Sequence, residues 1–403
     1  MTTESEKQPG TPRLLRAINE WRLLEHVRQH GPLSRAQLAR KTGLSKPTVS
    51  LALANLEGAG LVRPISRASS EGGGRQALLY ELDPTAGYVV GVDIGRSWVR
   101  VALADLSGVI ISRRKEENGT NDAERLVAMA TELARSIVAD AGLDWSCVVH
   151  TVIGTPGVFD APSGRVLFAS NLPGWGQSGL VEMLREALGS SLTVDNDANL
   201  AALGEQTFGC GATVRTFVFL IVGTGIGMGI ILDGSLYRGM HGAGGEIGFL
   251  PLTPGLSENT GASQRGMLED AASADGIVRL AEQMGMCPPL SAKRIFDAAR
   301  DGDTKALAVV KREGQHLALA VAAVAAILDP EMVILGGGIG HNLDLLRDPI
   351  ERRLEEITPL RPRLVASELG DEAVLLGTIA TGLTIARDQV FQQRAGDGRP
   401  NHV

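Results

Sequence analysis

Residues 192–205 read Leu192-Thr-Val-Asp195-Asn196-Asp197-Ala-Asn199-Leu-Ala-Ala-Leu-Gly-Glu205. An apolar, β-prone run passes into a polar cluster and then into an Ala/Leu-rich run, so we expect a strand that ends where a helix begins. In open α/β sheets the ligand crevice lies at the carboxyl ends of the strands. Two carboxylates and two amides at such an edge can bind a polyhydroxylated molecule or accept its proton. The alternative is structural, because Asp195 or Asp197 can simply cap the helix.

The composition is that of a globular α/β protein. Of the 403 residues, 44% are hydrophobic and 21% are charged, which supports large buried cores, and fifty glycines suit many tight turns. No apolar run reaches the length of a membrane span and the N-terminus has no secretory core, so we expect a cytoplasmic protein without a membrane partner. The three cysteines form no CxxC pair, which indicates neither a disulfide framework nor a zinc site.

The net charge of −7 is unevenly distributed along the chain. Residues 1–82 carry twelve Lys and Arg against seven Asp and Glu, whereas the remainder carries 27 against 39. A small basic module joined to an acidic body is typical of a nucleic-acid-binding head on a larger domain. We therefore divide the chain into a head (1–82), a linker (83–87) and a body (88–403).

The head has the pattern of a helix-turn-helix. A helix over about residues 14–30 precedes a short helix that begins at the capping box of Ser34 and Gln37 and ends near Lys41. Ser45 then caps a third helix, which is expected to enter the DNA major groove. Its expected buried face is Val49, Leu53 and Leu56. Its expected outward face supplies the candidate DNA contacts Ser45, Lys46, Thr48, Ser50 and Asn55.

A glycine-rich segment joins two predicted strands, at residues 61–65 and 77–82, and this pattern indicates a wing. Arg67 and Arg75 are further candidate DNA contacts, Arg75 through the minor groove. The alternative is a small three-helix module for dimerisation or protein binding. The basic balance and the polar outer face favour DNA, bound by a dimer on a palindromic operator.

The body predicts two related lobes. Its expected strands cover residues 88–93, 99–105, 109–115, 147–153, 216–222, 228–232 and 332–335. Its expected helices cover residues 122–139, 291–300, 304–328, 343–357 and 375–392. Two sets of three strands with glycine-rich turns, each followed by helices, predict lobes at about 88–200 and 201–403 around a cleft.

Seven motifs in the body occur in a characteristic order. They are Asp93-Ile-Gly95, Gly154-Thr-Pro-Gly157, Asn171-Leu-Pro-Gly-Trp175, Asn196-Asp-Ala-Asn199, Gly223-Thr-Gly-Ile-Gly227, Gly245-Glu246-Ile-Gly248 and Leu335-Gly-Gly-Gly338. This order resembles the ROK family of sugar kinases and sugar-responsive repressors. The repressor branch, which includes xylose and N-acetylglucosamine repressors, places a winged helix-turn-helix before a two-lobed body of the actin and hexokinase fold. The resemblance therefore implies an α/β protein with both parts of this chain.

The resemblance also implies roles for individual residues. Sugar hydroxyls would be contacted by Asn171, Asn196, Asp197, Glu246 and Glu269. In the kinases, the position of Asp197 holds the general base that activates the sugar hydroxyl. A nucleotide would be held by Asp93, Gly95, Gly223, Thr224, Gly225, Gly337 and Gly338, and that site applies only if the chain is a kinase.

The chain departs from the family pattern at the phosphate loop. Kinases carry Asp-x-Gly-Gly-Thr-Lys there, and residues 93–98 read Asp-Ile-Gly-Arg-Ser-Trp. Backbone amides approach a phosphate best with no β-carbon in the way, so we expect Arg96 and Trp98 to crowd or fill the pocket. This argues against ATP and Mg²⁺ as cofactors. The alternative is that Arg96 holds a phosphate electrostatically.

A second departure removes the zinc ligands of the family. Phe249, Thr260, Ala262 and Met267 stand at the one histidine and three cysteine positions, so we expect no metal and a contact between Phe249 and Met267. Without its metal clamp, the segment 257–265 is expected to order on ligand binding and to couple sugar binding to DNA release.

The sequence as a whole predicts a sugar-responsive transcriptional regulator, a repressor of carbohydrate metabolism genes, rather than an enzyme. It requires no cofactor, and its expected partners are operator DNA and a sugar or sugar phosphate. The expected assembly is a homodimer or a dimer of dimers. The alternative is an ATP-dependent sugar kinase or a bifunctional protein, because Asp197 and two glycine motifs are retained.

Overall fold

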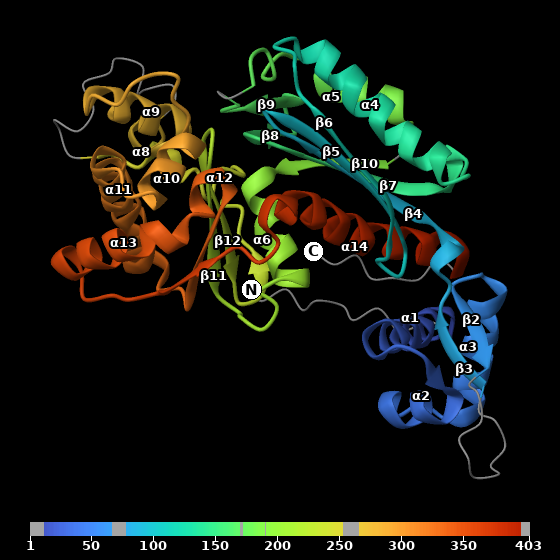
Figure 1. Ribbon diagram of the computed structural model, residues 1–403. Helices are drawn as coiled ribbons and strands as arrows, with labels where there is room; N and C mark the ends of the chain where they lie inside the picture. The colour runs from blue at the N-terminus through green and yellow to red at the C-terminus, as the bar shows by residue number, and fades with distance from the viewer. Residues whose placement is uncertain (1–11, 67–77, 170–171, 190, 253–265, 396–403) are drawn as a thin grey trace, which may run out of the picture.

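The computed structural model describes residues 12–66, 78–169, 172–189, 191–252 and 266–395. A small N-terminal head is joined to a larger body built around two five-stranded sheets (Figure 1). This is the α/β fold class that the sequence predicts. Within the described ranges, no helix is both long and apolar enough to cross a membrane.

The head contains three helices and a small sheet. Its elements are α1 (Pro12–His30), β1 (Leu33–Ser34), α2 (Arg35–Thr42), α3 (Lys46–Gly58), β2 (Val62–Ser66) and β3 (Leu78–Leu82). Both predicted caps are confirmed, since the Ser34 and Ser45 side chains accept hydrogen bonds from the amides of Gln37 and Thr48. The turn between α2 and α3 needs Gly43, because its φ of 70° is a left-handed conformation.

The predicted wing strands pair as an antiparallel hairpin. Val62 of β2 lies opposite Leu82 of β3, and the short strand β1, which the sequence did not predict, adds to the other edge of β3. The predicted core residues of α3 are fully buried. Arg67 and Arg75 lie outside the described residues.

The first sheet of the body has the strand order β10-β7-β4-β5-β6. Its strands are β4 (Tyr88–Ile94), β5 (Trp98–Asp105), β6 (Ile110–Glu117), β7 (Val148–Thr155) and β10 (Ser191–Asn196). The helices α4 (Ala123–Asp140) and α5 (Leu180–Leu188) cover one face, and a hairpin of β8 (Val158–Asp160) and β9 (Arg165–Leu167) lies beside it. The strand β10 runs parallel to β7, and Asn196 lies opposite Thr155. The motifs that begin at Gly154 and at Asn196 therefore lie side by side at the carboxyl ends of these two strands.

The second sheet has the strand order β13-β12-β11-β14-β15. Its strands are β11 (Phe217–Val222), β12 (Ile226–Leu232), β13 (Ser235–Leu236), β14 (Met332–Gly336) and β15 (Arg363–Ala366). The helices of this lobe are α8 (Met267–Ala272), α9 (Ala274–Gln283), α10 (Ala292–Arg300), α11 (Thr304–Leu328), α12 (Gly337–Gly340) and α13 (Leu343–Ile357). The side chains of β11, β12 and β14 that face these helices form the largest core of the molecule.

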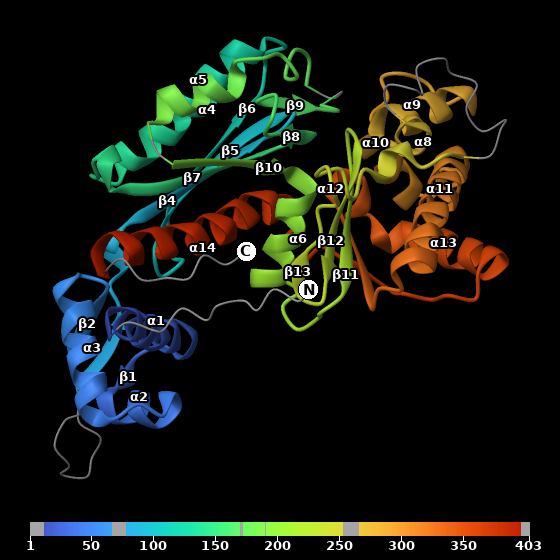
Figure 2. The same cartoon turned by 180° about the vertical axis from the view of Figure 1, so that it is seen from behind.

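Two helices, α6 (Asp197–Phe208) and α14 (Ala373–Ala395), lie between the two sheets (Figures 1 and 2). The C-terminal helix α14 packs on α6, β4 and β7, so it covers the second face of the first sheet. The sequence placed this helix in the second lobe (201–403), whereas in the structure it packs on the first sheet. Sequence order does not reveal which sheet a later helix will cover.

The head rests on the far end of α14. The rings of Trp21 in α1 and Phe391 in α14 meet edge to face, with centroids 5.1 Å apart. Arg394 donates a hydrogen bond of 2.6 Å to the carbonyl of Ala86, in the short 3-10 helix η1 (Pro84–Ala86). The predicted linker is therefore folded, and a single apolar cluster runs from the head into the body.

Candidate functional site

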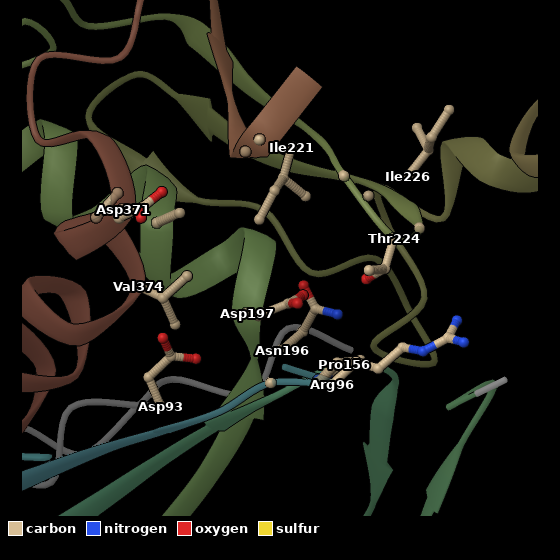
Figure 3. A pocket seen from close by; sticks show the side chains of 18 of the residues that line it. Asp93, Arg96, Pro156, Asn196, Asp197, Ile221, Thr224, Ile226, Asp371 and Val374 are labelled. Carbon is tan, nitrogen blue, oxygen red and sulfur yellow. The ribbon is translucent and has the colours of Figure 1, made fainter. Parts of the chain in front are cut away.

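A cleft of about 230 Å³ lies between the two lobes. Its walls come from the ends of β4, β10 and β11 and from the first turns of α6 and α14 (Figure 3). In the view of Figure 3, Asn196 and Asp197 lie in the middle, with Asp93 on one side and Arg96 on the other. Motifs that are far apart in the sequence thus meet in one place.

The polar cluster at the start of α6 is both a helix cap and a part of the cleft wall. Asn196 is the cap: its Oδ1 accepts from the amides of Ala198 (2.9 Å) and Asn199 (3.1 Å), and its Nδ2 donates to the carbonyl of Gly157 (3.1 Å). The sequence had offered its two aspartates for the cap, and the structure corrects this. An amide has four hydrogen-bonding positions, so these three bonds leave one N–H of Asn196 for a ligand.

Asp197 is the first residue of α6, and its Oδ1 accepts from the amide of Ala198 at 2.8 Å. Burial raises the pKa of the Asp197 carboxyl to about 7, and the charge of nearby Asp93 raises it further. Near neutral pH this group is therefore present both as an acid, which donates a hydrogen bond, and as a carboxylate, which accepts one. Such a group can pair with a hydroxyl or accept its proton.

Two glutamates of the second lobe complete this part of the cleft. Burial, together with the charge of Asp197, raises the pKa of Glu246 to about 7. Glu269 of α8 is buried, and its Oε2 accepts from the amide of Ile226 at 3.0 Å. The loop of Glu246 comes this close because residue 245 is glycine, with φ 102° and no β-carbon, which would lie 1.9 Å from a backbone oxygen.

The acidic end of the cleft is the name used below for Asn196, Asp197, Glu246 and Glu269. Three carboxyl groups and one amide offer several donors and acceptors within one small volume. Groups of this kind suit a neutral polyol, because each hydroxyl both donates and accepts a hydrogen bond.

A second set of cleft residues, called the arginine end below, consists of Asp93, Arg96, Trp98 and Arg100, of which Asp93 and Arg96 lie on either side of Asn196 and Asp197 in Figure 3. Asp93 of β4 lies directly across from Arg100 of β5, and Nη1 of Arg100 is 2.9 Å from Oδ2 of Asp93. Burial raises the pKa of Asp93 to about 6, although Arg100 opposes that shift. Nη2 of Arg100 is also 3.7 Å from Oδ2 of Asp371. The charge of Asp93 therefore already has a counter-ion within the protein.

Arg96 and Trp98 line the cleft at the arginine end, where the sequence placed them. Nη1 of Arg96 lies 3.6 Å from Oδ2 of Asp275 on α9, so this pair joins the two lobes. Lys115 lies over the ring of Trp98, with Nζ 4.3 Å from its centroid. The other nucleotide-site candidates also line the cleft: Gly95, Gly223, Thr224, Gly225, Gly337 and Gly338.

The candidate DNA contacts of the head are only partly exposed. Ser45 and Lys46 are exposed at the start of α3, whereas Thr48 and Ser50 are half-buried. Asn55 turns toward α1, and its Nδ2 donates a hydrogen bond of 2.6 Å to Oε1 of Glu20. The expectation that Asn55 lies on the outward face is corrected, because Glu20 is buried and its carboxylate needs a donor.

Comparison with known families identifies the body. The sequence model of the ROK family matches residues 89–384. The chain belongs to the ROK family. Residues 14–76 of this ROK protein match the MarR family as well, which agrees with the winged helix of the head.

Similar proteins include both repressors and kinases. The ROK protein is 28% identical to the xylose repressor of Caldicellulosiruptor bescii over 92% of this chain and 96% of that protein. It is 35% identical to the glucokinase of Thermotoga maritima over 72% of this chain and 95% of that protein. Among solved structures, it resembles a ROK family transcriptional regulator described as a homolog of the E. coli MLC protein. That likeness has a TM-score of 0.77 and 25% identity and covers 94% of this chain and 98% of the other.

Four of the five candidate sugar contacts of this ROK protein lie together at the acidic end of the cleft. The fifth, Asn171, lies outside the described residues, as do Thr260, Ala262 and the whole segment 257–265. The rings of Phe249 and Phe168 pack edge to face, with centroids 5.6 Å apart. The sequence did not predict this contact.

The sequence did not predict two arginines that pair with aspartates near the cleft, Arg100 and Arg238. Arg100 follows Asp93 by seven residues, and a tight turn between the two strands brings them opposite each other. The expected register of that hairpin was the signal that could have predicted the pair. Arg238 donates to Oδ2 of Asp195 at 2.6 Å and so holds the loop that leads to Glu246 against the end of β10. No local pattern in the sequence points to that pair, because it joins two lobes.

Proposed function

We propose that this ROK protein is a sugar-responsive transcriptional repressor. The observation that carries the proposal is the length of the match: the alignment with the xylose repressor spans head and body alike, whereas the alignment with the glucokinase spans 72% of the chain. In this proposal the head binds operator DNA as part of a homodimer, and the acidic end of the cleft binds a sugar or sugar phosphate.

The cleft supports sensing rather than phosphoryl transfer. Its acidic end offers groups that pair with sugar hydroxyls, and its arginine end presents a carboxylate that is already neutralised. Mg²⁺ is held in phosphoryl-transfer sites by free carboxylates and phosphates. To bind the metal, Asp93 would first have to release Arg100.

The helix α14 offers a path from the cleft to the head. Ala373 and Val374, in its first turn, line the cleft, and Phe391 and Arg394, in its last turns, contact the head. A helix is a rigid element, so a shift of its first turn on sugar binding would reach the head. This path supports the proposal that sugar binding changes the affinity for DNA.

A sugar kinase is the second candidate, and the retained Asp197 favours it. Its carboxyl has the raised pKa that suits a general base near neutral pH. The DNA-binding head and the paired carboxylate at the arginine end of the cleft argue against a kinase.

A mobility-shift titration tests the proposal. The full chain is mixed with DNA from upstream of its own coding sequence, and pentoses, hexoses, amino sugars and their phosphates are added in turn. We expect a shifted band that one of these sugars weakens or strengthens. Tight sugar binding with no shift on any DNA would contradict the repressor function.

A further inference from the structure

The outermost stripe of α3 is apolar. Val49, Ala52, Leu53 and Leu56 are buried in the head. On the opposite side, at the helical spacing i, i+4, i+7 and i+11, stand Pro47, Leu51, Ala54 and Gly58, all of them exposed. The side chain of Leu51 is the largest of these, and 54% of the residue is exposed.

Two polar residues of α3 that flank this stripe, Thr48 and Asn55, have partners within the head. Oγ1 of Thr48 lies 2.8 Å from Oγ of the N-cap Ser45, and Asn55 donates to Glu20. These two side chains thus use part of their hydrogen-bonding capacity within the head, which leaves Lys46 and Ser50 as the other polar candidates of α3. The stripe itself can offer only van der Waals contact.

The surface around the stripe is cationic. Residues 26–56 contain five Lys and Arg and no Asp or Glu, and the one acid of α3 is Glu57 in its last turn. Among these, Arg40, Lys41 and Lys46 are exposed around the turn that precedes α3. A second copy of the same face would bring like charges together, whereas DNA brings phosphates. The charge therefore selects DNA as the occupant of this face.

The major groove presents one apolar group on its base edges, the C5-methyl of thymine. We propose that Leu51 and Ala54 read thymine methyl groups, so that this protein recognises thymine in its operator half-site by apolar contact. The inference rests on the proposed function, since it assumes that α3 enters the major groove of an operator. It adds the chemical feature that α3 selects there.

Uracil substitution isolates the methyl group. Tight-binding duplexes are first selected with the full chain from a random 30-base-pair pool. Each thymine of a selected duplex is then replaced by deoxyuridine, which keeps the base pair and removes only the methyl. At one or two thymines per half-site we expect the wild-type affinity to fall about fourfold, the worth of one buried methyl group.

Variants show whether Leu51 makes that contact. Leu51→Ala should bind the thymine and uracil duplexes with equal affinity at one of the sensitive positions, the one that Leu51 contacts. Leu51→Met, which keeps an apolar side chain of similar volume, should retain the preference for thymine. The matched control is Leu15→Ala in α1, where the leucine is equally exposed (56%) and lies outside α3. It should retain the full fourfold difference.

Each contrary outcome is distinct. A wild-type protein indifferent to uracil at every position would overturn the inference and leave the repressor function standing. The same holds for a Leu51→Ala variant that still prefers thymine at every position where the wild type does. A Leu51→Ala variant that loses its dimer in sedimentation would assign the stripe to a second copy and overturn the inference too. Selection of no duplex at all would overturn both the inference and the proposed function.

Discussion

The two ends of the cleft use the same kind of residue in opposite ways. At the acidic end, Asp197 and Glu246 are half-buried, and desolvation together with the charges of neighbouring carboxylates raises their pKa values to about 7. At the arginine end, Asp93 is more deeply buried, and a guanidinium lies 2.9 Å from it. A carboxyl group that lacks a counter-ion is stabilised by a ligand that donates hydrogen bonds to it. A carboxyl group that already has a counter-ion is not stabilised further in this way. The difference supports the proposal that ligand recognition is concentrated at the acidic end.

Removing the counter-ion at the arginine end has the largest expected effect. Arg100→Ala leaves Asp93 buried without its partner and should lower the free energy of unfolding by about 3 kcal/mol at pH 8. Without Arg100 the pKa of Asp93 rises further above 6, so the loss should shrink as the pH falls to 5 and the carboxyl takes up a proton. Chemical denaturation at both pH values measures it.

The matched control for that variant is Arg113→Ala. Arg113 also forms an ion pair, with Glu372, but both side chains are largely exposed. Its loss should cost less than about 1 kcal/mol at either pH. An equal loss of unfolding free energy in the two variants would show that Arg100 does not stabilise the charge of Asp93. That result would contradict the difference between the two ends of the cleft.

Sugar affinity should respond to one end alone. Asp197→Asn keeps the size of the side chain and its bond to the amide of Ala198, but it removes the carboxyl group. It should weaken binding of the effector sugar by about 10- to 100-fold, the worth of a hydrogen bond to a charged group. Asp93→Asn, the same change at the arginine end, should alter that affinity by less than about threefold. Calorimetric titration measures both, and similar losses would contradict the division of the cleft.

The smallest expected effect is a gain in stability at the acidic end. Because folding raises the pKa of Asp197 from its ordinary value to about 7, its contribution to stability is greatest at low pH and is lost as the pH rises through 7. Asp197→Asn should therefore melt a few degrees higher than the wild type at pH 8, with little difference at pH 5. A variant that melts lower at pH 8 would mean that the Asp197 carboxylate has a favourable partner in the folded protein.

Much of this architecture follows from local sequence. The helices α11 and α13 begin and end where the sequence predicts, because Asp303 caps one and long apolar periodicity defines both. The start of α6 was likewise predicted from a β-prone run that turns into an Ala/Leu-rich one.

What the sequence missed depends on contacts between distant segments. The place of α14 against the first sheet, the partner of Asn55 on α1 and the pairing of Arg238 with Asp195 all join residues more than thirty positions apart. Local patterns predict which face of an element is apolar, but not which element will cover it. The strand β15 was missed because its four residues are too few to show a period. The helix α5 was missed although its buried residues recur at helical spacing.

The central claim is that this ROK protein keeps hydroxyl recognition and lacks phosphoryl transfer. The most direct test takes the sugar that changes the mobility shift and incubates it with the protein, ATP and Mg²⁺, with Asp197→Ala as the control and ADP as the readout. We predict that the sugar changes DNA binding while ADP forms no faster than with the control. Sugar-dependent ADP formation that Asp197→Ala abolishes would contradict the claim and make the protein a kinase.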